Sequence, residues 1–173
     1  MSRVGLGSAT EKGAAIVEIG PGAGHATKEF FNKFSPSRFY GIEISEAFRN
    51  RLKSDTELKP FLDAGTFTVH GDDAKDLGFI PDNSVDAVFA FNVVYFLDPI
   101  SLYLQEFHRI LKPGGSLNFG VKDIAKNMDQ SIYINSDWDK CLEEMKKAGF
   151  ENAKSEEARL EGPASYTPLV GTK

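Results

Sequence analysis

The segment Val17-Glu18-Ile19-Gly20-Pro21-Gly22-Ala23-Gly24 decides how this chain of 173 residues is expected to fold. Its three alternating glycines follow a short apolar run at 15–19 that predicts a strand, and they precede a stretch at 26–34 that predicts a helix. Glycine lets the backbone turn sharply and lets a ligand approach without meeting a Cβ. The helix that follows offers N–H groups and a partial positive charge. These features indicate an adenosine-cofactor site at the carboxyl end of the first strand, with a tight structural turn as the alternative.

Outward from this segment, strand-like and helix-like stretches alternate along the chain. Strands are expected at 39–44, 66–69, 85–91 and 117–121, and helices from 46 behind the cap Ser45, from Asp98-Pro99 to the turn Pro113-Gly114-Gly115, and at 136–148. The alternation predicts an α/β fold, with a doubly wound, mostly parallel, seven-stranded sheet and helices on both faces. The last two strands, 150–158 and 166–171, are separated by a turn at Gly162-Pro163, which predicts an antiparallel edge strand.

Composition places the chain among globular proteins of one domain. It carries 20 Lys and Arg against 25 Asp and Glu, a net charge of -5, which disfavours nucleic acid or an anionic membrane as a partner. The one cysteine, Cys141, excludes an internal disulfide, and its place beside Leu142 in a helical stretch favours packing over catalysis. No apolar run approaches the roughly 20 residues that span a bilayer, and no apolar signal core begins the chain, so we expect a cytoplasmic protein.

Two carboxylates decide which cofactor the glycine turn suits. Glu43 ends the second expected strand, where an acidic group can accept hydrogen bonds from ribose hydroxyls; a solvated strand end is the alternative. Glu18 lies in the approach to the turn, where it would repel a pyrophosphate but suit an ammonium group. His25 stands where the dinucleotide-binding pattern has its third glycine. These features favour S-adenosylmethionine, which has an ammonium, a sulfonium and no phosphate, over a nicotinamide dinucleotide.

Five segments, in order, resemble the motifs of class I methyltransferases, and most of all those of the methyltransferase type 11 group. They are VEIGPGAG at 17–24, YGIEIS at 40–45, Asp73-Ala74 with DLGF at 76–79, DNSVD at 82–86 and RILKPGG at 109–115. Gly78 replaces the proline that is usual in the third segment. The resemblance covers about residues 15–121 and implies a Rossmann-like fold with S-adenosyl-L-methionine as the cofactor.

The resemblance implies roles at the adenosine end of such a site. Glu43 would hold the ribose hydroxyls. Asp73 would accept a hydrogen bond from the adenine amino group, with Asp72 as its rival, and Ala74 would offer its backbone N–H to the ring. Ile44 could pack on the adenine face or be a core residue at the end of the strand.

At the methionine end, the resemblance implies that Gly20, Gly22 and Gly24 admit the methionine and ribose parts of the cofactor. Glu18 would face the ammonium side, and Asn92, just past the fourth strand, would border the methionine end. The chain has no Asn-Pro-Pro-Tyr-like tetrad, because Asn92 is followed by Val93-Val94-Tyr95. This lowers the expectation of methylation on a base or amide nitrogen.

No catalytic residue follows from the sequence, because a general base is needed only if the accepting atom must lose a proton early. Two candidates remain. His25 follows the glycine turn and could lie near the chemistry or could cap the helix. Tyr95 could line the acceptor pocket or pack against Phe96. We expect His70 to be structural and His108 to lie at the surface, and we expect no metal.

The domain organisation is expected to be a short, Gly- and Ser-rich segment at 1–14, without the helices that usually form a lid, followed by a methyltransferase domain at 15–173. The chain could be a fragment, a short isoform, or a domain whose lid is completed by a partner protein. The expected function is S-adenosylmethionine-dependent methyl transfer to an unidentified small-molecule acceptor. The alternatives are a cofactor-binding subunit without independent activity and an NAD-dependent oxidoreductase.

Overall fold

The computed structural model describes residues 12–122, 128–157, 159–161 and 164–173, in which strands and helices alternate as the sequence predicts. The strands are β1 (Ala15–Ile19), β2 (Arg38–Ile42), β3 (Phe67–His70), β4 (Val85–Phe91), β5 (Leu111–Lys122), β6 (Glu151–Ser155), β7 (Arg159–Glu161) and β8 (Ala164–Thr172). The helices are α1 (His25–Lys33), α2 (Glu46–Ser54), α3 (Lys59–Asp63), α4 (Ile100–Ile110) and α5 (Trp138–Lys147), with a 3-10 turn, η2 (Val94–Phe96), after β4.

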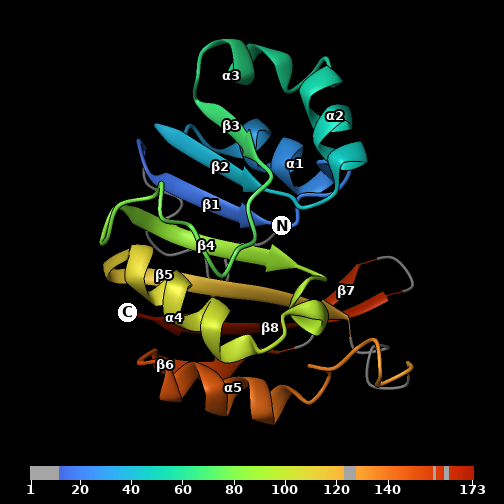
Figure 1. The fold of residues 1–173 in the computed structure, drawn as a ribbon, viewed down its shortest axis with the longest axis vertical. Coiled ribbons are helices and arrows are strands. Elements are labelled where there is room, and N and C mark those ends of the chain that lie inside the picture. Colours follow the sequence, from blue (N-terminus) through green and yellow to red (C-terminus); the bar gives the residue numbers. More distant parts are fainter. Residues whose placement is uncertain (1–11, 123–127, 158, 162–163) are drawn as a thin grey trace.

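Seven strands lie side by side in the order β3-β2-β1-β4-β5-β8-β6, and the short β7 pairs with β8 off this path (Figure 1). The pairs among β1 to β5 are all parallel. β8 runs antiparallel to both β5 and β6, and so forms the antiparallel edge with β6 outermost. The predicted fold class, a mostly parallel seven-stranded sheet with an antiparallel edge, is therefore confirmed.

Two hydrophobic cores cover the two faces of the sheet, because successive side chains on a strand point to opposite faces. On one face Phe39 and Phe89 pack against Phe30 of α1, with ring centroids 5.3 and 5.5 Å apart. On the other face, Val17 and Val88 belong to a core that includes residues of α4 and α5. The predicted arrangement, with helices on both faces, follows from this alternation.

Several boundaries differ from the prediction, and three of them lie at the ends of α4 and α5. The N-cap of α4 is Pro99 rather than Asp98. The segment Pro113-Gly114-Gly115 lies inside β5, which begins at Leu111 directly after α4. The pairing shifts there from Val85 with Leu111 to Ala87 with Ser116, so the segment is a bulge in a strand that already pairs, rather than the loop before it. Helix α5 begins at Trp138, behind an Asp137 cap, two residues later than expected.

Some expectations lie outside the described residues, namely those for 1–11 of the N-terminal segment and for the turn at Gly162-Pro163. Within the ranges that are described, no helix is long and apolar enough to cross a membrane. Cys141 is buried in α5, as expected for a packing residue, and burial raises the pKa of its thiol to about 12.

Candidate cofactor-binding site

The segments that follow β1, β2, β3 and β4 meet at one edge of the sheet, because these strands are parallel and paired in register. Ile19 pairs with Ile42 on one side and with Ala90 on the other. Ile42 pairs in turn with His70 of β3. The chain runs outward from β1 to β3 and then returns to β4 on the opposite side of β1. Such a reversal leaves a crevice at the carboxyl ends of the strands, where α/β proteins bind ligands.

The three glycines of the turn all have left-handed backbones, with φ of 64° at Gly20, 53° at Gly22 and 79° at Gly24, which other residues adopt only at a cost. They differ in what surrounds them. A Cβ at Gly20 would lie 2.5 Å from Val93 Cγ2, and one at Gly24 would lie 2.8 Å from Leu52 Cδ2. A Cβ at Gly22 would meet no described atom within 4 Å. Gly20 and Gly24 therefore allow close packing, whereas Gly22 presents bare backbone to open space.

Glu43 lies beside this bare backbone and is only 6% exposed, so the alternative of a solvated strand end is wrong. Its Oε2 accepts a hydrogen bond from Gly22 N at 2.9 Å, and its Oε1 accepts one from Ser45 N at 2.9 Å. A carboxylate has about four acceptor positions, so each oxygen can accept a further hydrogen bond. Glu43 is thus a fixed acceptor that could receive two hydroxyl donors from a ligand.

Glu18 is a buried carboxyl on β1, 2% exposed, next to the glycine turn. Its Oε2 accepts a hydrogen bond from Thr27 Oγ1 of α1 at 2.5 Å. Burial raises the pKa of Glu18 to about 7, helped by the nearby charge of Glu43 and opposed by the hydrogen bond from Thr27. A cationic group of a ligand would favour the ionised form of this carboxyl, and a phosphate would oppose it.

The segment after β3 places Asp73 and Ala74 in different settings. Asp73 is half-exposed and pairs with Lys75 Nζ at 3.0 Å. Partial burial opposes its ionisation, but hydrogen bonds from Lys75 and Tyr103 outweigh burial and lower the pKa of Asp73. Ala74 is buried, 5% exposed, and Asp72 is exposed. Asp73 therefore has a carboxylate that the protein orients through hydrogen bonds from Lys75 and Tyr103.

Ile44, directly after Glu43, is 75% exposed, so the alternative of a core residue at the strand end is wrong. The guanidinium of Arg49 in α2 donates to the backbone oxygens of Glu43 and Ile44, at 2.9 and 2.8 Å. This contact fixes the backbone of the turn while the Ile44 side chain stays available to a ligand.

Arg109 ties together three of the segments that carry the resemblance. Its guanidinium donates to the backbone oxygens of Leu77 and Ile80, both at 3.0 Å. It also pairs with Glu106 at 2.7 Å and Asp82 at 2.5 Å, and Glu106 accepts from Leu77 N at 2.6 Å. The long segment between β3 and β4 is therefore fastened to the end of α4. This network is structural and fastens the part of that segment that follows Asp73 and Ala74.

Asn92 begins the segment after β4 and has a left-handed backbone, with φ of 59°. Its N donates to Gly120 O at 2.8 Å, and its Oδ1 accepts from the Tyr95 hydroxyl at 3.3 Å. The same hydroxyl accepts from Lys122 N at 2.5 Å. Next to Asn92, Val93 fills the space in front of Gly20. The segment after β4 therefore adjoins the glycine turn, as the predicted place of Asn92 at the methionine end requires.

The two catalytic candidates lie in contrasting surroundings. His25 is exposed at the first position of α1; because the N-cap is Gly24, the helix-capping alternative is wrong. Tyr95 is 2% exposed and packs against Phe96 with ring centroids 5.7 Å apart, as its packing alternative states. His70 stacks on Phe79 at 4.2 Å, and the half-buried His108 packs edge-on against Phe150 at 5.3 Å. Among the described residues, no group of His, Cys, Asp and Glu is arranged to hold a metal ion.

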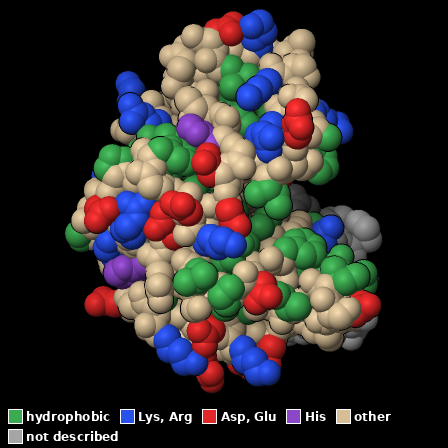
Figure 2. All heavy atoms as spheres, in the orientation of Figure 1, with side chains coloured by type: hydrophobic (Ala, Val, Ile, Leu, Met, Phe, Trp, Pro, Cys, Tyr) green, Lys and Arg blue, Asp and Glu red, His purple; other side chains and the backbone are tan. Residues whose placement is uncertain are grey.

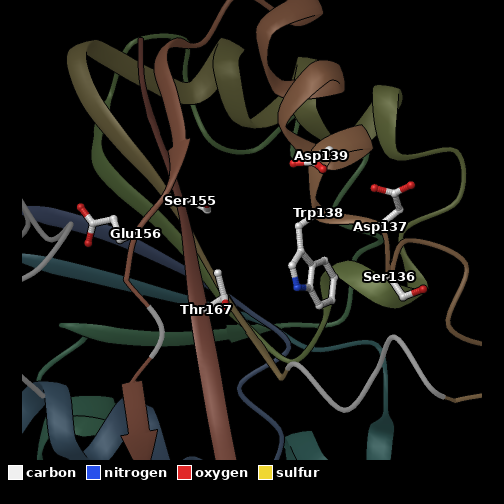
Figure 3. A pocket seen from close by; sticks show the side chains of 7 residues that line it. All are labelled: Ser136, Asp137, Trp138, Asp139, Ser155, Glu156 and Thr167. Atoms are coloured by element: carbon white, nitrogen blue, oxygen red, sulfur yellow. The ribbon is translucent and has the colours of Figure 1, made fainter.

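A pocket of about 480 Å³ lies farther along the sheet, on the other side of β5, between the beginning of α5 and the strands β6 and β8 (Figure 3). Its lining residues are Ser136, Asp137, Trp138, Asp139, Ser155, Glu156 and Thr167. Trp138 lines the pocket and also packs on Tyr95, with ring centroids 6.0 Å apart. None of the residues predicted for the cofactor contributes to it, so we keep it separate from the candidate site.

Sequence reasoning missed the partners that hold the site together. Thr27 bonds to Glu18, Tyr103 bonds to Asp73, and Val93 packs against Gly20. A fourth, Asn135, donates from Nδ2 to the backbone oxygens of Val94 and Leu97, at 2.9 and 2.7 Å. Thr27 carried a readable signal, because it is a polar residue on the otherwise apolar inner face of α1. The others depend on contacts between segments far apart in the chain.

Comparison with known proteins agrees with this geometry. Residues 17–119, more than half of the chain, match the model of a family described as methyltransferase domain. The chain is 33% identical over 125 residues to the sterol 24-C-methyltransferase ERG6B of Gibberella zeae, covering 72% of this chain and 30% of that protein. It is 29% identical over 104 residues to a fatty-acid O-methyltransferase of Mycolicibacterium smegmatis, covering 60% of this chain and 35% of that protein. The chain thus spans about a third of the length of these relatives.

The fold agrees as well. A chain of the complex between the Haloferax volcanii Trm112 methyltransferase activator and its methyltransferase superposes with a TM-score of 0.70 at 20% identity, covering 97% of this chain and 89% of that chain. The family match contradicts the alternative of an NAD-dependent oxidoreductase. The buried Glu18 beside the glycine turn agrees with this, because its carboxylate would repel a pyrophosphate. This chain belongs to the methyltransferase domain family and has the class I fold of its S-adenosylmethionine-dependent members.

Proposed function

We propose that this domain binds S-adenosylmethionine and transfers its methyl group to a small-molecule acceptor. The observation that carries the proposal is the pairing of Glu43 with Gly22. A buried carboxylate, fixed by two backbone N–H groups, stands beside a glycine whose outward side is open. That is what the two hydroxyls of a ribose need, and the neighbouring Glu18 suits a cation rather than a pyrophosphate. The residues present therefore fit this cofactor.

The cofactor would extend across the edge of the sheet. Asp73, Ala74 and Ile44 would receive the adenine on the β2 and β3 side. Glu18 and Asn92 would border the methionine part on the side of β4. The bare backbone at Gly22 would let the ligand pass closely between them.

When bound, S-adenosylmethionine supplies a methyl group on a sulfonium, which is already a good leaving group. The work of the protein is therefore to hold the cofactor, align the accepting atom with it and exclude water. We assign His25 as the candidate base for an acceptor that must lose a proton, because it is exposed beside the glycine turn. We do not assign this role to Tyr95, whose hydroxyl is already held between Asn92 and Lys122.

The acceptor that suits the described surface is a small molecule with an apolar body. Phe96, Ile132 and Ile134 are 51, 56 and 41% exposed, and they lie in the segments after β4 and β5, where Figure 2 shows hydrophobic side chains gathered at the right of the view. Tyr133 lies between the two isoleucines in the chain, and its ring centroid lies 5.4 Å from that of Phe96. The names of the two relatives, a sterol and a fatty-acid methyltransferase, support this class of acceptor.

The test has two stages. In thermal or chemical unfolding, S-adenosylhomocysteine at a hundred- to thousand-fold excess over its dissociation constant should stabilise the protein by about 3–4 kcal/mol, whereas NAD should not. A screen with radiolabelled methyl donor should then find transfer to neutral apolar acceptors. Stabilisation by NAD and not by S-adenosylhomocysteine would refute the proposal.

A second candidate is a domain that binds the cofactor but transfers methyl groups efficiently only with a partner protein. The similarity to a chain from a complex with a methyltransferase activator favours it. Cofactor binding without turnover on any acceptor, restored by a co-purifying protein, would support this candidate. Turnover by this chain by itself would exclude it.

A further inference from the structure

We infer that Tyr95 and Asn135 are positioning residues, which set Asn92 against the methionine end of the cofactor without touching the ligand themselves. The inference rests on the proposed function, because it presumes that the cofactor lies along this edge of the sheet. It adds that the buried hydroxyl of Tyr95 and the side-chain amide of Asn135 control the methionine end of the site.

The first observation is the place of Asn92. The order β3-β2-β1-β4-β5 puts it on the opposite side of the glycine turn from Glu43 and Asp73. A ligand whose ribose lies at Glu43 and whose adenine lies at Asp73 must therefore send its other end toward Asn92. Val93 packs directly against Gly20, so the segment after β4 lies next to the glycine turn.

The second observation is how Asn92 is held. A left-handed backbone is unfavourable for a residue with a side chain, although Asn tolerates it better than most. The hydrogen bond from Asn92 N to Gly120 O fixes the backbone, and the Tyr95 hydroxyl fixes the side-chain oxygen. With its oxygen engaged by Tyr95, the side-chain N–H₂ of Asn92 has a defined direction. Tyr95 therefore decides where the two donors of Asn92 point.

The third observation is how Tyr95 is held. It lies in η2, whose two ends are fastened by Asn135 through the backbone oxygens of Val94 and Leu97. Its ring packs against Tyr133, 5.4 Å away, and Trp138, 6.0 Å away. Asn135, Tyr133 and Trp138 all belong to the chain between β5 and the first turn of α5. That segment therefore reaches Asn92 through Tyr95, and a change in it should be felt at the methionine end.

The experiment compares two ligands that differ only at that end. S-adenosylhomocysteine carries the amino-acid part, and 5′-methylthioadenosine lacks it. The full chain is titrated with each by calorimetry. Tyr95→Phe should weaken S-adenosylhomocysteine by about three- to tenfold, the range of one hydrogen bond, and should leave 5′-methylthioadenosine within about twofold. Asn135→Leu should shift the two ligands in the same unequal way.

Two matched variants provide the controls. Tyr40→Phe removes the hydroxyl of a buried tyrosine on β2, which accepts from Arg38 Nη1, and should change neither ligand. Tyr103→Phe removes the hydroxyl that bonds to Asp73, at the adenine end, and should weaken both ligands equally. Asn135→Leu could fail to fold, but Tyr95→Phe keeps the ring packing. Its second loss, the acceptor for Lys122 N, should affect both ligands alike.

The outcomes separate this inference from the proposed function. If the unmodified chain binds neither ligand, the proposed function fails. If it binds both, and Tyr95→Phe weakens both equally or neither, the function stands and the positioning role is wrong. An equal loss would show that Tyr95 only stabilises the fold.

Discussion

The adenosine end and the methionine end of the candidate site are built in different ways. At the adenosine end, Glu43 and Asp73 are carboxylates whose oxygens are held by the protein and still have acceptor capacity. At the methionine end, Asn92 is uncharged and is itself held, by Gly120 and Tyr95. The adenosine end offers hydrogen-bond acceptors to a ligand, whereas at the methionine end the neighbours of Asn92 fix its position. Substitutions at the adenosine end should remove contacts with the ligand directly. Substitutions at the methionine end should alter affinity by moving Asn92.

The largest expected effect lies where the two ends join. Gly20→Ala would force a left-handed alanine and place its Cβ about 2.5 Å from Val93 Cγ2. The strained backbone and the clash should together lower the free energy of unfolding by roughly 2–5 kcal/mol. Gly22→Ala, which has the same strain without the clash, should cost only about 1–2 kcal/mol. Denaturant unfolding of both variants measures the difference. Equal losses would mean that Val93 does not couple the two ends.

The next effect concerns Glu18, which would border the methionine part of the cofactor from β1. Burial raises the pKa of Glu18 from 4.5 to about 7. Between these two pH values, the carboxyl is protonated in the native state and ionised in the unfolded state. This group should therefore lower the free energy of unfolding as the pH rises from 4.5 to 7, by about 3 kcal/mol in total. Its contribution is fully present below the unfolded pKa and is lost by the time the pH passes the folded one.

Glu18→Gln tests this directly. The substitution keeps the size of the side chain and removes its titration, so the variant should gain stability relative to the original chain as the pH rises. Urea unfolding at about pH 4.5 and pH 8 measures the change in that difference. Parallel stability curves for the two chains would show that Glu18 titrates normally.

A smaller effect is expected at Glu43. Glu43→Gln replaces an oxygen that accepts from a backbone N–H with a group that cannot accept, and it removes the charge that a ribose would meet. The affinity for S-adenosylhomocysteine should fall by about 1.5–3 kcal/mol, as for hydrogen bonds to a charged group. Glu46→Gln, the same change at an exposed position three residues on, is the control and should bind normally. Unchanged calorimetric affinity in folded Glu43→Gln would remove Glu43 from the site.

The smallest effect is expected at Ile44. Because Ile44 is 75% exposed, Ile44→Ser should change the stability of the fold by less than about 0.5 kcal/mol. If the side chain packs on the adenine, the affinity for S-adenosylhomocysteine should fall by about 1 kcal/mol, part of the value of burying an isoleucine. Leu102→Ser, on the exposed side of α4, should leave the affinity unchanged. The two variants binding alike would show that Ile44 is a solvated residue.

The sequence allowed the fold to be predicted where the signal is local. The apolar composition of residues 15–19 is enough to predict the strand before Gly20. Ser45 caps α2, because its side chain accepts a hydrogen bond from Phe48 N. The composition of Pro113-Gly114-Gly115 predicts only a turn, because the pairing that makes this segment a bulge comes from β4. The same limit applies to the site. Glu43 could be proposed from its place after a strand. The hydrogen bond from Lys122 to Tyr95 and those from Asn135 to Val94 and Leu97 could not, because they join residues far apart in the chain.

The place of β8 has a consequence for how the molecule assembles. β8 pairs with β5, β6 and β7, and the last two have no other strand partner among the described residues. It also follows all of them in the chain, so during synthesis β5 remains an open edge until β8 has emerged. The parallel part of the sheet can form earlier, from segments that are already present. The antiparallel part cannot complete its pairing until this central strand is present. Its pairing with β5 joins segments that are far apart in the chain, and such pairing is slow. During that wait β5 is an unpaired edge that is open to pairing with another chain, and the arrival of β8 removes this exposure.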